Sequence, residues 1–404
     1  MIIQTTLGKF CPFKYGKELS ANKRLPGDFP VYGSNGIVGF HNESYVKTHG
    51  VLIGRKGSVG ALHISDGPFW PIDTSFYVVK GGYFETLYTY YLLKSLGLDN
   101  MNSDSAVPGL NIDNAHALKI DVLEKEEDRA AVGKLISKFD DKIKNNQRMN
   151  ETLEKMARAI FKSWFVDFDP VHAKAAGNTP AHMDADTAAL FPNSFGDNGL
   201  PLGWQRSSLG ESLTIKRGGS PRPIHDFLAP EGLAWTKISD ATASQSPFIF
   251  ATQQFIKPEG LKKTVLLSKG ELILSNSATP GIPKFLDIEA CIHDGWLYFP
   301  SSTLFSKNYL YLLFLTLREI FIAQGNGSVF TNLKIDIIRN QTVNIPTKAV
   351  LHALEEIIKP LFDCILHNSR NSIMLTELRD TLLPKLMSGE IRVKDVERQV
   401  EEAV

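Results

Sequence analysis

The sequence predicts a mixed α/β (α+β) protein with two similar globular modules. Two long, antiparallel coiled-coil helices separate the modules, and the halves are expected to be related by pseudo-twofold symmetry. Three observations support this prediction. Two long stretches carry a continuous heptad spacing, and polar residues occupy matching positions within both. Features of the N-terminal half also return in the same order in the C-terminal half.

The first heptad stretch runs from residue 132 to residue 164. Its seam residues recur at alternating steps of four and three, which is the spacing of a helix that packs lengthwise on another helix. At 1.5 Å per residue such a helix spans roughly 50 Å, so it needs a partner of similar length to bury its seam. The seam positions are Val132, Ile136, Phe139, Ile143, Asn146, Asn150, Leu153, Ala157, Ile160 and Trp164.

The second heptad stretch, from residue 354 to residue 386, supplies that partner. One charged residue, Arg379, departs from the pattern. We expect its side chain to face a partner subunit or the solvent edge, because an unpaired charge is unfavourable in a buried seam. The seam positions are Leu354, Ile358, Leu361, Ile365, Asn368, Ser372, Leu375, Arg379, Leu382 and Leu386.

Polar residues lie in the middle of both seams: Asn146 and Asn150 in the first, Asn368 and Ser372 in the second. A buried polar residue weakens a coiled coil but fixes its register. Matching the polar positions allows a parallel or an antiparallel pair, and the pseudo-twofold relation of two like halves favours the antiparallel one. The alternative is two ordinary amphipathic helices that belong to two separate globular domains.

Start and stop signals divide the chain. Acidic residues at 124 and 126–128 suit the positive end of a helix dipole. Asp169-Pro170 ends the first long helix, and Thr347 is a suitable N-cap for the second. Residues 171–199 have the composition of a linker with little core of its own. The predicted divisions are a first module at 1–123, a long helix at 124–170, a linker at 171–199, a second module at 200–346, a long helix at 347–391 and a tail at 392–404.

The two modules share an internal repeat. Short strand-like runs bounded by glycines precede a helical run and a short polar motif in each. The matching segments are Leu7-Gly8 with Leu209-Gly210, Gly50-Val51-Leu52-Ile53 with Gly270-Glu271-Leu272-Ile273, residues 88–93 with 309–314, and Leu110-Asn111-Ile112-Asp113 with Leu333-Lys334-Ile335-Asp336.

Composition excludes several classes of protein. Of the 404 residues, 43% are hydrophobic and 22% charged, as in soluble globular proteins, and the formal net charge of +0 argues against gripping nucleic acid by bulk electrostatics alone. The three cysteines form no disulfide framework, which favours a reducing cytoplasm. The most apolar run, 309–317, is too short to span a bilayer and predicts a core helix, so no membrane partner is expected.

Motifs of catalysis are absent from the sequence. There is no P-loop, no nucleophile elbow of the G-x-S-x-G type and no H-E-x-x-H zinc site. The glycine-rich stretch at 54–60 (GRKGSVG) follows only a short strand and opens no helix, which disfavours a phosphate cradle. The histidines are scattered and predict no metal site. We therefore expect no catalysis, metal or cofactor in this chain alone.

Binding features are better represented, because basic, aromatic, amide and hydroxyl residues alternate in loops of both modules. Arginine and lysine suit guanine edges and phosphates, asparagine suits adenine, and serine or threonine suits any base. The alternative is a set of ordinary solvated loops. The candidate DNA-binding residues are Lys14, Lys17, Tyr32, Ser34, Asn35, Arg55, Lys56 and Ser58 in the first module, and Lys216, Arg217, Ser220, Arg222, Asn276, Ser277, Thr279, Asn326, Ser328 and Thr331 in the second.

Nearly the whole chain resembles the specificity subunit of a type I restriction-modification system. The motifs that carry the resemblance are GRKGSVG with FWPIDTSF (69–76), the first helix segment FDDKIKNNQRMNETLEKMARAIFKSWFVDFDP (139–170), IHDGW (292–296), SVFTNLKID (328–336) and the terminal LLPKLMSGEI (382–391). The helical segments are similar to the repeated spacer regions of that family, and the modules are similar to its target recognition domains.

The resemblance implies a function without catalysis. Each recognition domain would read one half of a bipartite, asymmetric sequence in double-stranded DNA, and the helix pair would set the unspecified gap between the halves. Two modification subunits would bring S-adenosylmethionine and methylate an adenine at N6 after flipping it from the duplex. Motor-nuclease restriction subunits would use ATP and Mg²⁺. The candidate DNA-binding residues above rest on their chemistry, because base contacts do not carry over between recognition domains.

Two other functions remain open from the sequence. One is a scaffold that does not bind DNA and carries two peptide-binding modules on a coiled-coil rod. The other is an enzyme with an active site that its motifs do not reveal. Neighbouring genes for an adenine methyltransferase and a helicase-nuclease would favour the specificity subunit over both.

Overall fold

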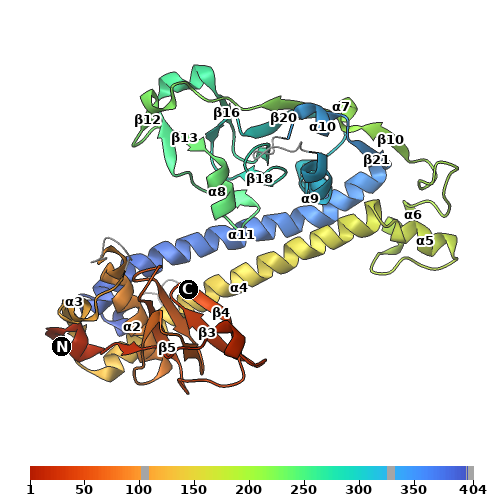
Figure 1. The fold of residues 1–404 in the computed structure, drawn as a ribbon. Coiled ribbons are helices and arrows are strands. Elements are labelled where there is room, and N and C mark those ends of the chain that lie inside the picture. The colour runs from red at the N-terminus through yellow and green to blue at the C-terminus, as the bar shows by residue number, and fades with distance from the viewer. Residues whose placement is uncertain (102–108, 325–332, 397, 399–404) are drawn as a thin grey trace. The chain divides into compact units, whose positions relative to one another are not determined.

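The computed structural model describes residues 1–101, 109–324, 333–396 and 398 (Figure 1). Their contacts form two compact units. The first unit comprises Met1–Asn145 and Asn371–Val404, and the second comprises Asn146–Arg370. Two helices of 40 residues each, α4 (Glu126–Phe165) and α11 (Lys348–Met387), contribute one part to each unit. The mixed helix and sheet class and the two long helices predicted from the sequence are confirmed.

The first unit has two small sheets, and α2 packs on the one that contains β5 and β6. The sheets have the strand orders β2-β8-β5-β6 and β4-β3-β7, and β1 pairs separately with β9. In chain order the elements before the long helix are β1 (Ile2–Thr6), α1 (Leu7–Phe10), β2 (Lys14–Tyr15), η1 (Ala21–Lys23), β3 (Phe29–Gly33), β4 (Gly36–His41), β5 (Gly50–Gly54), β6 (Leu62–Ser65), β7 (Trp70–Pro71), β8 (Ser75–Val78), α2 (Tyr83–Ser95), η2 (Leu98–Asn100), α3 (Ile112–His116) and β9 (Lys119–Leu123).

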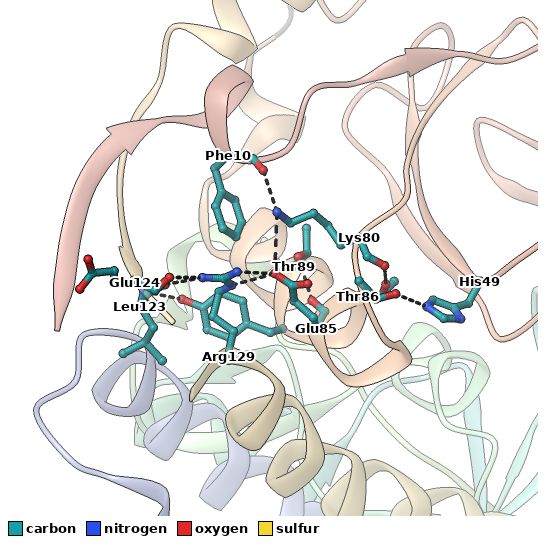
Figure 2. A network of polar contacts seen from close by, with 11 residues as sticks. Phe10, His49, Lys80, Glu85, Thr86, Thr89, Leu123, Glu124 and Arg129 are labelled. Atoms are coloured by element: carbon teal, nitrogen blue, oxygen red, sulfur yellow. Dashed lines mark hydrogen bonds and ion pairs between the residues drawn. The ribbon is translucent and has the colours of Figure 1, made fainter. Parts of the chain in front are cut away.

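The start of α4 is fixed to α2 by a buried ion pair (Figure 2). The Nε and Nη2 atoms of Arg129 donate to Glu85 Oε1 at 2.8 and 2.6 Å, and Arg129 Nη1 donates to the carbonyl oxygens of Leu123 and Glu124. A Cβ at Gly133 would lie 1.9 Å from the carbonyl oxygen of Phe84. The close approach of α4 to α2 therefore requires glycine there.

The second unit has two five-stranded sheets, in the orders β11-β20-β17-β18-β14 and β12-β15-β13-β19-β16. In chain order its elements between the long helices are α5 (Asp169–Ala175), α6 (Ala185–Ala189), β10 (Gln205–Ser208), α7 (Leu209–Ser212), β11 (Leu213–Arg217), η3 (Ile224–Asp226), β12 (Leu228–Ala229), β13 (Leu233–Thr236), α8 (Ile238–Ala243), β14 (Phe248–Ile249), β15 (Gln254–Ile256), η4 (Pro258–Lys263), β16 (Val265–Leu267), β17 (Leu272–Ser275), β18 (Pro283–Leu286), β19 (Ala290–Ile292), β20 (Trp296–Ser302), α9 (Lys307–Gln324), α10 (Ile335–Arg339) and β21 (Thr342–Ile345).

The two units repeat one another, which confirms the internal repeat. The pair β1 and β9 corresponds to β10 and β21, and α2 corresponds to α9. The antiparallel order β8-β5-β6 corresponds to β20-β17-β18. The apolar run 309–317 lies in α9, whose residues Tyr309 to Phe314 are all buried, as expected of a core helix.

Within each unit, α4 and α11 pack side by side and run antiparallel (Figure 1). In the first unit, Val132 and Ile136 share a core with Leu386 and Leu383. In the second unit, Ala157 and Phe161 share a core with residues from Val350 to Ile365. The structure thus favours a helix pair over two unrelated amphipathic helices.

Polar seam residues of the second unit contact one another across the pair. Asn146 Nδ2 donates to the Asn368 carbonyl oxygen at 3.3 Å, Asn368 Nδ2 donates to Asn150 Oδ1 at 3.0 Å, and Asn150 Nδ2 donates to Ser369 Oγ at 3.0 Å. These side chains are buried or half-buried. The other predicted seam positions, Ile136, Phe139, Ile143, Leu153, Leu361, Ile365, Ser372 and Leu375, are also buried or half-buried.

The segment 171–199 has more core than its composition predicted. Val171 and Phe191 are 0% and 2% exposed and join the main core of the second unit. The Phe191 ring packs edge-on against Trp164, with 5.0 Å between ring centroids. The aromatic end of α4 needs a cover against water, and this segment provides it.

Candidate nucleic-acid interface

Three loops of the first unit meet at the turn between β7 and β8. The Arg55 N–H donates to the carbonyl oxygen of Thr74 at 3.0 Å, and Ser34 Oγ donates to the same oxygen at 2.5 Å. The Lys17 N–H donates to the Pro71 carbonyl oxygen at 2.8 Å. Loops that are distant in sequence and carry predicted DNA-binding residues are therefore joined at one place.

Aromatic rings hold the two cations of this cluster. The Arg55 guanidinium lies 5.0 Å from the centroid of the Tyr15 ring, and Arg55 Nη1 donates to the Asp73 carbonyl oxygen at 3.1 Å. Lys17 Nζ lies 5.5 Å from the Tyr45 ring centroid. Cation–π contacts restrict these long side chains, and so a surface of positive charge and exposed aromatic rings forms.

The second unit builds the same frame around the turn between β19 and β20. Arg217 Nε donates to the carbonyl oxygen of Asp294 at 2.5 Å. The Asp294 carboxylate accepts from Ser220 Oγ at 2.8 Å and from Arg222 Nη2 at 3.1 Å. Burial alone would raise the pKa of Asp294, but these hydrogen bonds hold that pKa below its ordinary value. The turn carboxylate is thus ionised and locks the cationic loop in place.

Backbone hydrogen bonds show that the two frames are equivalent. The Gly16 N–H donates to Ser75 O as the Gly218 N–H donates to Trp296 O, at 3.0 and 2.9 Å. The residue after the central strand also donates to a turn carbonyl oxygen in both units: the Arg55 N–H, after β5, to Thr74 O, and the Asn276 N–H, after β17, to Gly295 O. In each unit an arginine side chain donates to the backbone carbonyl oxygen of the turn aspartate, Asp73 or Asp294. The two arginines come from different segments, because Arg55 follows β5 whereas Arg217 ends β11. The side chains at equivalent places therefore differ.

The structure separates the predicted DNA-binding residues by exposure. Exposed positions are Lys14, Lys17, Asn35, Lys56, Lys216, Arg217 and Arg222, and half-buried positions are Arg55, Ser58, Ser220, Ser277 and Thr279. Tyr32, Ser34 and Asn276 are buried, with 7%, 9% and 4% exposed, so they shape the loops and offer little surface to a ligand. Asn326, Ser328 and Thr331 lie outside the described residues.

An open groove of about 930 Å³ in the second unit, next to Ser220 and Arg222, is lined by several polar and aromatic residues that were not among the predicted DNA-binding residues. Among them are Trp235, Lys237, Gln254 and His293. The IHDGW motif included His293, but no pattern marked the others. They lie on or beside a sheet that has five strands, where the first unit has the three strands β4-β3-β7.

The known family of type I restriction modification DNA specificity domains matches residues 4–155 and 201–374. The chain belongs to this family. The matched ranges correspond to the two copies of the internal repeat, and each includes part of a long helix.

Named specificity subunits are similar over most of the chain. The type I restriction enzyme MjaIX specificity subunit of Methanocaldococcus jannaschii is 25% identical over 361 residues, which cover 86% of this chain and 78% of that protein. The HindI specificity subunit of Haemophilus influenzae is 27% identical over 345 residues, which cover 70% of this chain and 71% of that protein. The crystal structure of the type I S subunit from M. genitalium shares the fold, with a TM-score of 0.61, 16% identity and 96% coverage of both chains.

Specificity subunits are the non-catalytic chains of their systems. Over residues 1–101, 109–324 and 333–396, no group of three or more His, Cys, Asp or Glu side chains is placed to hold a metal ion. Among the helices of the described part of the chain, none is both long enough and apolar enough to cross a membrane.

Proposed function

We propose that this chain is the DNA-specificity subunit of a type I restriction-modification complex, in which each module reads one half of a bipartite, asymmetric target. One observation carries the proposal. The chain holds two copies of one loop frame, and the frames present different cationic and polar side chains at equivalent places. Two equal frames suit two pieces of the same duplex, and different side chains suit two different base sequences.

The helix pair sets the unspecified gap between the half-sites and docks the methyltransferase subunits. Hydrogen bonds between Asn150 and Asn368 support this role, because buried polar contacts fix the register of a helix pair and hence its length. A ruler must have a fixed length in order to select a fixed number of base pairs.

Catalysis comes from the partner subunits. Two modification subunits bind S-adenosylmethionine and methylate adenine at N6, and motor-nuclease subunits use ATP and Mg²⁺ for translocation and cleavage. The formal net charge of +0 supports this division, because much of the attraction to DNA phosphates then has to come from the partners. The assembled complex acts in the cytoplasm, where its DNA target and its cofactors are present.

Co-expression with the cognate modification subunits, followed by methylome sequencing, tests the proposal. We expect the chain to co-purify with those subunits and the host DNA to carry N6-methyladenine in one bipartite, asymmetric motif. The modification subunits expressed without this chain are the control, and they should leave that motif unmodified. Absence of any modified motif, together with no co-purification, would contradict the proposed function.

A further inference from the structure

The groove beside the second frame has walls from four separate segments. The loop after β11 contributes Arg222, the end of β13 contributes Trp235 and the adjacent Lys237, β15 contributes Gln254, and the turn after β19 contributes His293. It is open to solvent along one side and shares Arg222 with the predicted DNA-binding loop. A ligand that contacts this loop would therefore lie over the groove as well.

Lys237 and Gln254 form a pair that offers mainly hydrogen-bond donors to a ligand. Lys237 Nζ donates to Gln254 Oε1 at 3.3 Å. Because an ammonium group has no acceptor, the amide oxygen must face the lysine, and the amide NH₂ points away from it. No other hydrogen bond of Lys237 Nζ or of the Gln254 amide nitrogen occurs among the described residues. The pair thus keeps several N–H donors for a ligand.

One buried carboxylate holds the backbone of Lys237 and of Gln253, the residue before Gln254. Asp240, which is 8% exposed, accepts from the Lys237 N–H at 2.7 Å through Oδ2 and from the Gln253 N–H at 3.3 Å through Oδ1. The start of α8 and the start of β15 are therefore joined through a single side chain. Such support keeps a recognition pair in place before its ligand arrives.

The neighbouring acceptors are already engaged in hydrogen bonds with the protein. The Asp294 carboxylate already accepts from Ser220 and Arg222. Burial lowers the pKa of His293, so its ring is neutral at pH 7, and the Gly295 N–H donates to Nδ1 at 2.6 Å. The polar groups left for a ligand in this groove are mainly the donors of Lys237, Gln254 and Arg222.

The geometry points to a guanine-reading site in the second module, in which Lys237 and Gln254 donate to the major-groove edge of a G·C pair. Guanine presents two acceptors there, N7 and O6, whereas adenine presents a donor beside its N7. The adenine amino group would meet a donor in this groove and is disfavoured. This inference rests on the proposed function and adds the base class that the second module selects.

The variant Gln254→Glu tests the pair. A carboxylate still accepts from Lys237, so the local contact is kept, but the amide donor becomes an acceptor. In the complex assembled with modification subunits, we expect methylation to fall about tenfold to a hundredfold at sites with guanine at one position of one half-site. The other half-site should stay unchanged. Lys262→Ala, an exposed lysine in η4 outside the groove, is the matched control and should leave the motif intact.

A second measurement changes the DNA and leaves the protein as it is. The wild-type complex is titrated with duplexes in which 7-deazaguanine replaces that guanine, which removes the N7 acceptor. We expect binding to weaken about tenfold at this position, and to change little when the substitution lies in the unspecified gap. This measurement remains decisive if Gln254→Glu fails to fold.

Three results would overturn the inference. Uniform weakening of Gln254→Glu on all sequences, with the motif unchanged, would show that the pair contacts a phosphate. An unchanged motif and rate would show no contact at all. A half-site of the second module that contains no G·C pair would also contradict the inference. In each case a bipartite motif methylated by the wild-type complex leaves the proposed function standing, whereas the absence of any motif would remove both.

Discussion

The Arg379 guanidinium on α11 lies 2.7 Å from the Asp140 carboxylate on α4, within the first unit. The same carboxylate accepts from the Tyr91 hydroxyl at 2.8 Å, and the guanidinium lies 5.4 Å from the Tyr91 ring centroid. The side chains of Arg379 and Asp140 are only 12% and 17% exposed. The charge in the second seam thus has an internal partner, which corrects the expectation that Arg379 faces a partner subunit or the solvent edge.

Asp140→Asn should destabilise the first unit, because the largely buried Arg379 charge then has to rely on Asp380, a carboxylate that is 55% exposed. We expect the free energy of unfolding to fall by about 1–3 kcal/mol. Urea unfolding measures this. The matched control is Asp363→Asn, which breaks the exposed pair of Lys359 and Asp363 on the same helix and should change stability little. Equal effects of the two variants would contradict a buried pair at Arg379.

Asn368→Leu and Asn146→Leu should affect the stability of the helix pair differently. The first removes the Asn368 amide that donates to Asn150, so the half-buried Asn150 amide oxygen loses this donor at a cost of about 1–3 kcal/mol. Asn146 donates to the backbone carbonyl of Asn368, and replacing it by leucine exchanges polar seam contacts for apolar packing. We expect the midpoint of thermal unfolding to fall for Asn368→Leu and to rise or stay equal for Asn146→Leu. A fall of the same size in both variants would refute this difference.

Lys284 predicts a pH dependence of stability in the second unit. Burial lowers its pKa to about 8, although Glu154 acts in the opposite direction. Between pH 8 and about 10.5 the folded lysine has lost its proton while the unfolded lysine keeps it. The unfolded state then binds more protons, so the contribution of Lys284 to stability rises with pH in this window.

The variant Lys284→Met isolates this contribution from the titration of other groups. The difference in unfolding free energy, wild type minus variant, should rise by about 1–3 kcal/mol from pH 8 to pH 10. Urea unfolding of both proteins at several pH values measures it. A difference that stays flat or falls over this range would show that Lys284 remains protonated in the folded state.

A heptad inserted into both long helices should lengthen the gap in the recognised sequence. Seven helical residues add about 10 Å, which corresponds to roughly three base pairs of duplex. The insertions belong beside Asn150 in α4 and beside Asn368 in α11, so that the hydrogen-bonded register is kept. Methylome sequencing reads the gap directly. The control has the insertion in one helix only, which breaks the register and should abolish methylation. A longer pair with an unchanged gap would refute the ruler.

Periodicity predicted the helix pair but not its contacts with the modules. A heptad pattern shows which face of α11 is covered, yet the partners of Arg379 include Tyr91 from α2, which is far away in sequence. The same limit applies to residues 171–199. Their polar composition predicted a linker, while Val171 and Phe191 bury the segment in the core and the Phe191 ring packs on Trp164.

The candidate interface was predictable in part for a related reason. Basic residues in glycine-rich loops marked Arg55, Arg217 and Arg222. Lys237 and Gln254 lie on segments without a repeat or motif, and only the fold brings them within 3.3 Å of each other. A pairing between a helix start and a distant strand leaves no pattern in the sequence.

The central claim is that each module reads its own half-site, and exchanging one module tests it most directly. Residues 200–346 are replaced by the corresponding module of another specificity subunit, and the methylome of the resulting complex is sequenced. We expect one half of the methylated motif to change, while the other half and the gap stay as they were. A change in both halves of the motif would contradict it.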